Sequence, residues 1–107
     1  MTSVDLSEAT FDKTIAEAEI VLVDFWASWC APCLQFAPVF EAAALANPDI
    51  VFGKVNTEVE VDLARTSGIT SIPTLMAFRD GLLVFEESGA LAAAGLRSVI
   101  EIVRDLT

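Results

Sequence analysis

The sequence predicts an α/β domain in which a mixed β-sheet lies between helices. An apolar, β-branched and aromatic run at Ile20–Ala27 leads into a segment with helical spacing, as is typical of a buried parallel strand and the helix after it. Farther along, Arg79-Asp80-Gly81 separates two apolar runs, and Asp-Gly in that position indicates an antiparallel hairpin. With 107 residues, the chain is expected to form a single domain over 1–107.

The other elements follow from apolar residues spaced at helical or strand intervals. This spacing predicts a helix within Ser7–Glu19 and another within Cys30–Asn47. Pro32 suits the first turn of the second helix, whereas Pro38 should kink it. The remaining expectations are a strand at Ile50–Asn56, a helix at Val59–Thr66 ending near Gly68, strands at Thr74–Phe78 and Leu82–Glu86, and a final helix with the inner stripe Leu96, Val99, Ile100 and Val103.

The charge and the composition of the chain exclude several classes of function. Sixteen Asp and Glu residues against six Lys and Arg give a formal net charge of −10, which repels phosphate backbones and anionic lipids. We therefore expect no nucleic-acid and no membrane partner. The sequence has no His, which removes Ser-His and Cys-His catalysis and every imidazole metal ligand. Met1–Glu8 lacks the basic and apolar stretches of a signal peptide, so we expect a cytoplasmic location.

The two cysteines, Cys30 and Cys33, stand where the apolar strand gives way to a helix. Free N–H groups and the dipole at a helix start stabilise a thiolate, which is the reactive form of cysteine. Cys30 comes first, at an exposed turn, and is expected to attack; Cys33, one turn inside, is expected to resolve the mixed disulfide. Two other interpretations stay open: small apolar core residues, or a metal shared by two chains, since two thiolates leave zinc two ligands short.

Two charged residues interrupt apolar runs. Asp24 lies inside the first strand, where burial would raise its pKa, and Lys54 has a similar place in the next strand. If these strands are neighbours, the two side chains meet beneath the cysteines, and Asp24 takes the proton from Cys33 as it attacks. The alternative places both charged groups at strand ends in water.

Apolar residues near Cys30 predict a contact surface on which an extended substrate segment pairs with exposed main chain. The alternative makes Trp29 and Ile72 ordinary half-buried packing residues. The residues of this surface are Trp29, Ala31, Pro32, Ile72 and Pro73.

Distinctive residues recur along nearly the whole chain. In order, they are Val23-Asp24-Phe25-Trp26-Ala27, Trp29-Cys30-Ala31-Pro32-Cys33, Pro38, Lys54-Val55-Asn56, Gly68-Ile69, Ile72-Pro73-Thr74, Phe78, Gly81 and Gly89. With these residues in this order, the chain resembles the thioredoxin family. The resemblance implies the thioredoxin fold, with a central mixed five-stranded sheet, strands 1–3 as its parallel part, a C-terminal antiparallel hairpin and four flanking helices.

The resemblance also implies an activity, that of a thiol-disulfide oxidoreductase. Such a protein reduces disulfides in client proteins and is recharged by an NADPH-dependent flavoprotein thioredoxin reductase. By this resemblance Cys30 is the nucleophile and Cys33 the resolving thiol, the two forming a disulfide when oxidised. Asp24 is the proton acceptor, linked to Lys54.

Further expectations concern the groove and what binds there. The resemblance implies a cis bond before Pro73, and places Gly89 and Ala90 in the loop that completes the substrate groove. We expect no cofactor, no metal and a monomer.

Two positions depart from the family pattern. Ala31 replaces the usual glycine and stiffens the turn slightly, while Leu34 replaces a common basic residue, which removes a positive charge and enlarges the apolar face. Oxidases and isomerases of the superfamily often carry His within the tetrapeptide, and Ala31-Pro32 has none, which favours a reductant. The alternatives are a disulfide isomerase or oxidase, and a partner-binding module with the same fold.

Overall fold

The computed structural model describes residues 3–106, and these contain one five-stranded sheet in the order β1-β3-β2-β4-β5. The elements are β1 (Val4–Asp5), α1 (Phe11–Glu17), β2 (Ile20–Trp26), α2 (Ala31–Ala46), β3 (Val51–Asn56), α3 (Val61–Thr66), β4 (Thr74–Arg79), β5 (Leu82–Ser88) and α4 (Ala93–Asp105). β1 and β2 run parallel to β3, whereas β4 runs antiparallel to β2 and β5. The expected fold, with its parallel part and C-terminal hairpin, is confirmed.

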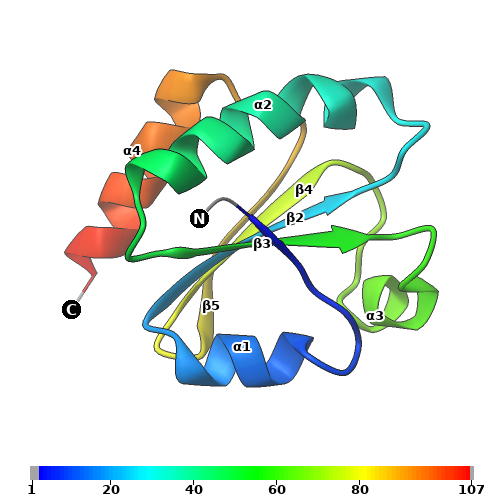
Figure 1. Ribbon diagram of the computed structural model, residues 1–107, viewed down its shortest axis with the longest axis horizontal. Helices are drawn as coiled ribbons and strands as arrows, with labels where there is room; N and C mark the ends of the chain where they lie inside the picture. Colours follow the sequence, from blue (N-terminus) through cyan, green and yellow to red (C-terminus); the bar gives the residue numbers. More distant parts are fainter. Residues whose placement is uncertain (1–2, 107) are drawn as a thin grey trace.

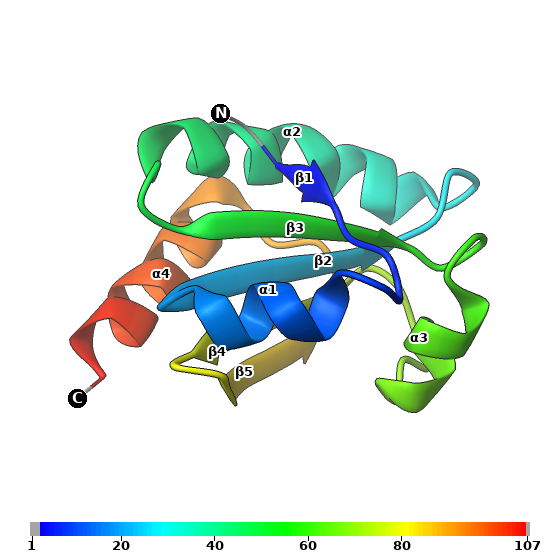
Figure 2. The same ribbon diagram turned by 60° about the horizontal axis from the view of Figure 1, so that its bottom comes forward.

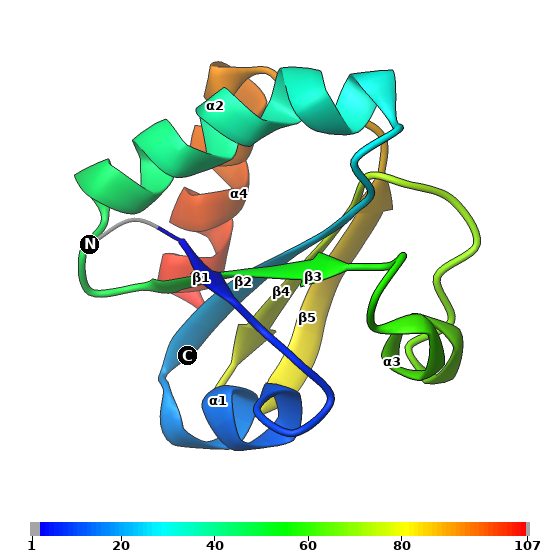
Figure 3. The same cartoon turned by 45° about the vertical axis from the view of Figure 1, so that its right-hand side comes forward.

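Two helices cover each face of the sheet. α2 and α4 lie on one side and α1 and α3 on the other, in the view of Figure 1 and again in Figure 3. Successive residues of a strand point to opposite faces, so Leu22 and Phe52 pack in the core beneath α2 and α4, while Val23 and Val55 pack in the core beneath α1 and α3. β2 is therefore buried on both faces, which explains its nearly unbroken apolar run.

The first strand is the element that apolar spacing did not predict. β1 has two residues and pairs with β3 at the edge of the sheet, where Figure 2 shows it. Gly53 of β3 makes room for Leu6, just after β1, because a Cβ at that position would overlap the Leu6 side chain. α1 begins at Phe11, within the expected range and with Thr10 as its N-cap residue, because Ser7–Thr10 forms a turn closed by the Thr10 N–H, which donates to the Ser7 carbonyl at 3.1 Å.

The hairpin and the final helix confirm their predictions. Asp80 and Gly81 have φ angles of 52° and 84°, the left-handed pair that a two-residue hairpin turn requires. The expected stripe of α4 is buried against the sheet. Both strands run slightly longer than expected, to Arg79 and Ser88, because cross-strand pairing extends over them.

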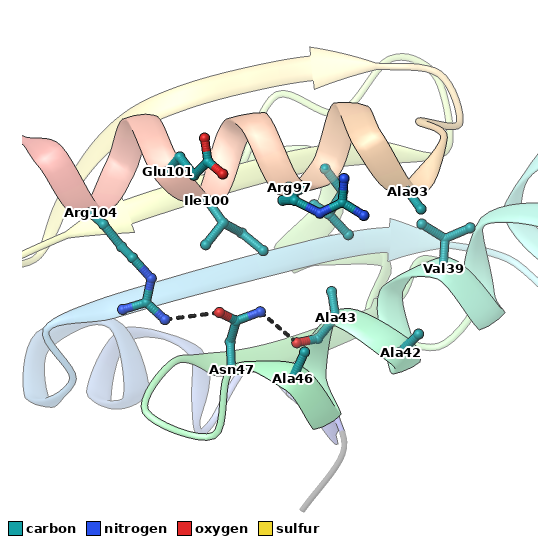
Figure 4. A pocket seen from close by; sticks show the side chains of 11 residues that line it. Val39, Ala42, Ala43, Ala46, Asn47, Ala93, Arg97, Ile100, Glu101 and Arg104 are labelled. Carbon is teal, nitrogen blue, oxygen red and sulfur yellow. Dashed lines mark hydrogen bonds between the residues drawn. The ribbon is translucent and has the colours of Figure 1, made fainter.

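α2 runs through Pro38 as one helix, and the kink expected there stays a prediction. Asn47, at its C-terminal end, links it to α4, as Figure 4 shows. Arg104 donates to Asn47 Oδ1 at 2.9 Å, and the Asn47 amide donates to the Ala43 carbonyl at 2.9 Å. These bonds fix the far end of the helix whose first turn carries the cysteines.

Within residues 3–106, no helix combines the length and the apolarity needed to cross a bilayer. Met1 and Thr2, which begin the segment examined for a signal peptide, lie outside the described residues.

Candidate redox site

Cys30 and Cys33 form a disulfide at the N-terminus of α2, with their Cα atoms 5.2 Å apart. Cys30 is the N-cap residue, and its Sγ accepts a hydrogen bond from the Cys33 N–H at 3.3 Å. Pro32 occupies the first turn, where a helix needs no N–H from it. The sequence thus places one sulfur where free N–H groups and the helix dipole favour a thiolate once the disulfide is reduced.

The expectation that Cys30 is exposed is wrong for the disulfide form. Cys30 is 4% exposed and Cys33 1%. The Cys30 sulfur is bonded to that of Cys33 and lies 3.7 Å from the Ile72 carbonyl oxygen, and Ala27, Trp26 and Ile72 pack around the pair. Cys30 is still the less buried of the two. The interpretation as two plain apolar residues is also wrong, because the sulfurs are bonded to each other.

The loop before β4 and the loop after β5 meet beside the disulfide. The Ile72–Pro73 bond is cis, as the resemblance implied, and Pro73 is buried. The Gly89 N–H donates to the Pro73 carbonyl at 2.8 Å, so two segments far apart in the sequence are joined here. Ala90 follows Gly89 on the exposed surface.

An apolar surface surrounds the disulfide on the solvent side. Trp29 is 72% exposed and Leu34 54%, and Ala31 and Pro32 are exposed between them. The alternative that Trp29 is an ordinary half-buried packing residue is therefore wrong, while Ile72 is half-buried as that alternative expected. A shallow hollow adjoins Trp29, and its lining residues are Trp29, Thr57, Ala64, Ile69, Thr70, Ser71 and Ile72.

Asp24 is fully buried on the central strand, on the side of the sheet that faces the cysteines. It shares that side with Leu22, which packs in the core beneath α2, and with Trp26, which packs against Cys30 and Cys33. Lys54 of β3 is its register partner. The alternative that placed Asp24 at a strand end in water is wrong.

Burial raises the pKa of Asp24 to about 7, and the positive charge of Lys54 works against this shift. Neither carboxylate oxygen has a hydrogen-bond partner in the part of the chain that the structure describes. The Lys54 amine lies 4.6 Å from the centre of the Trp26 ring, and Lys54 is half-buried. Asp24 and Lys54 are thus neighbours in the sheet, as expected, and the charge of Lys54 acts on Asp24. The Lys54 amine itself lies over the Trp26 indole ring.

Sequence reasoning missed a group of polar residues beside the disulfide. The Ser28 N–H and hydroxyl both donate to Glu58 Oε1 at 2.7 Å, and the Thr57 N–H and hydroxyl both donate to the Trp26 carbonyl, at 2.9 and 3.0 Å. A signal was available, because Asn56, Thr57 and Glu58 follow a buried parallel strand, and the carboxyl ends of such strands are where sites form.

These features define a class. A disulfide that closes a short loop at a helix N-terminus, beside a cis-proline and on the same side of the sheet as a buried carboxyl group, is a dithiol–disulfide centre able to gain and lose two electrons. The site is that of a thiol-disulfide oxidoreductase.

Comparisons with known proteins identify the family. A family model described as Thioredoxin matches residues 2–102. The chain is 55% identical over 107 residues to "Putative thioredoxin 2" of Streptomyces coelicolor, covering 99% of this chain and 80% of that protein. It is 43% identical to thioredoxin 1 of Synechococcus elongatus, covering 90% of this chain and 92% of that protein.

Solved structures agree. The thioredoxin of Plasmodium falciparum superposes with a TM-score of 0.85 at 34% identity, covering 94% of this chain and 97% of that one. A mutant thioredoxin from Halobacterium salinarum gives 0.88 at 30% identity, covering 98% and 92%. The chain belongs to the thioredoxin family, and it is a thiol-disulfide oxidoreductase with the Cys30–Cys33 pair at the active-site position. Disulfide-containing clients and reductases are its general classes of partner.

Proposed function

We propose that this protein is a cytoplasmic electron carrier that reduces client disulfides and is recharged by an NADPH-dependent flavoprotein thioredoxin reductase. The observation that carries the proposal is the disulfide at the N-cap of α2 with the exposed apolar surface around it. Family membership supports the same chemistry. The absence of His within Ala31-Pro32 supports a reductant, since no imidazolium stabilises the thiolate.

The first step joins the carrier to its client. The Cys30 thiolate of the reduced protein attacks one sulfur of the client disulfide, the client S–S bond breaks, and the other client sulfur leaves as a thiolate. The Cys33 N–H, which points at Cys30 Sγ, stabilises the attacking thiolate. Trp29, Ala31, Pro32 and Ile72, with Gly89 and Ala90 beyond them, form the surface on which the client lies, and the buried Pro73 holds Gly89 in place through its carbonyl group.

The second step releases the client. Cys33 gives its proton to the carboxylate of Asp24 and attacks Cys30 Sγ, which forms the Cys30–Cys33 disulfide and expels the bound client sulfur as a thiolate. Two electrons have then passed from the dithiol to the client. A carboxyl group with a pKa of about 7 suits this role, because it can accept and release a proton near neutral pH. Lys54 moderates that pKa through its charge.

A coupled assay tests the proposal. The purified protein, a thioredoxin reductase, NADPH and insulin as the disulfide substrate are mixed, and NADPH oxidation is followed by absorbance. We expect oxidation that depends on all four components. Because the carrier has a net charge of −10, we also expect a monomer in sedimentation.

Three results would contradict the proposal. If the protein reduces insulin when dithiothreitol is the electron donor but not when reductase and NADPH are, the NADPH-dependent reductase is not its partner. A reduction potential far above that of a reductant, measured against glutathione, would indicate an oxidase or isomerase. Full cellular function of a Cys30→Ser/Cys33→Ser double variant would indicate a partner-binding module.

Leu34 offers a test of the electrostatics at the helix start. Position 34 follows Cys30 by four residues and therefore lies on the same side of the first turn. Leu34→Lys should place a positive charge near the Cys30 thiolate and shift its titration in the reduced protein to lower pH by about half a unit. The ultraviolet absorbance of the thiolate against pH measures this shift.

Leu45→Lys is the matched control, because Leu45 is also exposed on α2, at 64%, but lies far from the sulfurs. Leu45 follows Cys30 by fifteen residues, so at about 1.5 Å of rise per residue it lies roughly 22 Å along the helix from that residue, beyond the Debye length of about 8 Å at physiological salt. Equal titrations of the two variants would show that position 34 has no influence on Cys30.

A further inference from the structure

The connection between β2 and α2 is held from the side by the segment that follows β3. Four hydrogen bonds join the two segments: the Ser28 N–H and hydroxyl donate to Glu58 Oε1, and the Thr57 N–H and hydroxyl donate to the Trp26 carbonyl. The Glu58 N–H in turn donates to Asn56 Oδ1 at 2.9 Å, which fixes the carboxylate-bearing residue itself. In the described residues, Glu58 is the single side chain that reaches Ser28.

Ser28 is the residue directly before Trp29. Trp29 is the most exposed large apolar side chain of the redox surface, and it forms one wall of the hollow whose other residues include Thr57 and Ile72. A side chain so exposed has few packing contacts to fix it, so its place depends on the backbone that carries it. Glu58 holds Ser28 through two bonds at 2.7 Å, one from the backbone N–H and one from the hydroxyl group, and the ionised carboxylate accepts both.

Resting on the proposed function, we propose that Glu58 is a positioning residue: its carboxylate holds Ser28, and thereby keeps Trp29 in place to receive the apolar side chain of a client beside Cys30. The contact is made in the ionised state, since the two hydrogen bonds from Ser28 lower the pKa of Glu58. The carboxylate touches neither sulfur, so its effect should fall on client binding and leave the electron transfer itself unchanged.

This assignment separates two kinds of substrate. A protein client needs the Trp29 wall, whereas a small disulfide such as 2-hydroxyethyl disulfide reaches Cys30 without it. Loss of two charge-assisted bonds at one residue should lower the second-order rate constant for insulin about tenfold. The half-saturating concentration of insulin should rise, the maximal rate should stay the same, and the rate with 2-hydroxyethyl disulfide should be unchanged.

The experiment measures single-turnover oxidation of the pre-reduced protein by each disulfide, with acid quenching and thiol alkylation as the readout. Glu58→Ala removes both bonds, Ser28→Ala removes the hydroxyl bond and keeps the N–H donor, and Glu58→Gln keeps a neutral acceptor. We expect the defect with insulin to be largest in Glu58→Ala, smaller in Ser28→Ala and partly rescued in Glu58→Gln. Asp62→Ala, an exposed carboxylate on α3, is the control for lost charge and should behave as wild type.

The outcomes are distinguishable. Wild-type kinetics of Glu58→Ala with insulin, or an equal loss with both disulfides, would overturn the positioning role. If Glu58→Ala does not fold, Ser28→Ala decides the question by the same two results, because this variant leaves Glu58 and its backbone contacts intact. A wild-type protein inert toward both disulfides would overturn the proposed function, and the role of Glu58 with it.

Discussion

The Cys30→Ser variant should lose the reduction of protein disulfides, by at least about a thousandfold in the coupled assay. Serine at the N-cap of α2 keeps the hydrogen bond to the Cys33 N–H, because Ser is itself a favourable N-cap residue. The fold should therefore survive. A hydroxyl group, unlike a thiol, is barely ionised at neutral pH and cannot form a mixed disulfide, so the first step has no nucleophile.

Cys33→Ser is the paired variant, and it should fail differently. Its Cys30 thiol can still attack the client, but nothing resolves the mixed disulfide, so covalent complexes with clients should accumulate. Non-reducing electrophoresis followed by mass spectrometry measures them. Normal turnover by Cys30→Ser would refute the assigned nucleophile, and a Cys33→Ser variant that traps no client would remove the resolving role.

Asp24→Asn should abolish most of the pH dependence of stability between about pH 4 and about pH 7. Burial raises the pKa of Asp24 from 3.8 to about 7, so the folded state holds a proton that the unfolded state releases. Stability is then fully present below the unfolded pKa and is lost as pH rises through the folded pKa. At about 1.4 kcal/mol per pKa unit, the loss amounts to about 4 kcal/mol in the wild type.

Denaturant unfolding of both proteins at several pH values measures this effect. The wild type should become less stable toward pH 8, while the variant, which has no proton to release at position 24, should change much less. Glu17→Gln, which removes an exposed carboxylate from α1, should follow the wild-type curve. Parallel curves for Asp24→Asn and the wild type would show that Asp24 titrates normally.

The same variant tests the proton transfer. Without a carboxylate on the sheet beneath Cys33, release of the client from the mixed disulfide should slow by about a hundredfold near pH 7, the scale of a lost general base. The rate should recover as pH rises, since Cys33 then ionises without help. Rapid-quench measurement of client release against pH decides this. An unchanged rate at pH 7 would assign Asp24 a purely structural role.

The elements that sequence patterns predicted well are those specified locally. β2 is buried on both faces and reads as an apolar run, and the turn at Asp80-Gly81 needs the φ angles that these residues adopt readily. The stripe of α4 follows from helical spacing alone. Apolar spacing could not predict β1, because a strand of two residues shows no periodicity. Its formation depends on pairing with β3, almost fifty residues away in the sequence.

The sequence predicted which residues form the site, but it did not predict how buried they are or which side chains contact them. The position of Cys30 at a helix start could be predicted because an apolar strand precedes it and Pro32 follows it, and both features are local in the sequence. Its burial depends on Ile72, 42 residues away, and no local pattern places that loop over the sulfur. Lys54 was expected to approach Asp24 directly, but the amine lies over Trp26, since an indole face also attracts a cation.

Around one pair of sulfurs, the chain brings together three connections: those following β2, preceding β4 and following β5, the last two joined through Gly89 and Pro73. Electron transfer is confined to the two sulfurs at the start of α2, which follows the first connection, while Ile72 of the second and Gly89 and Ala90 of the third contribute to the surface that an approaching protein meets. Substitutions in the second and third connections can therefore change which proteins bind without altering the reaction at the sulfurs. The same thiol-disulfide exchange can then serve many clients.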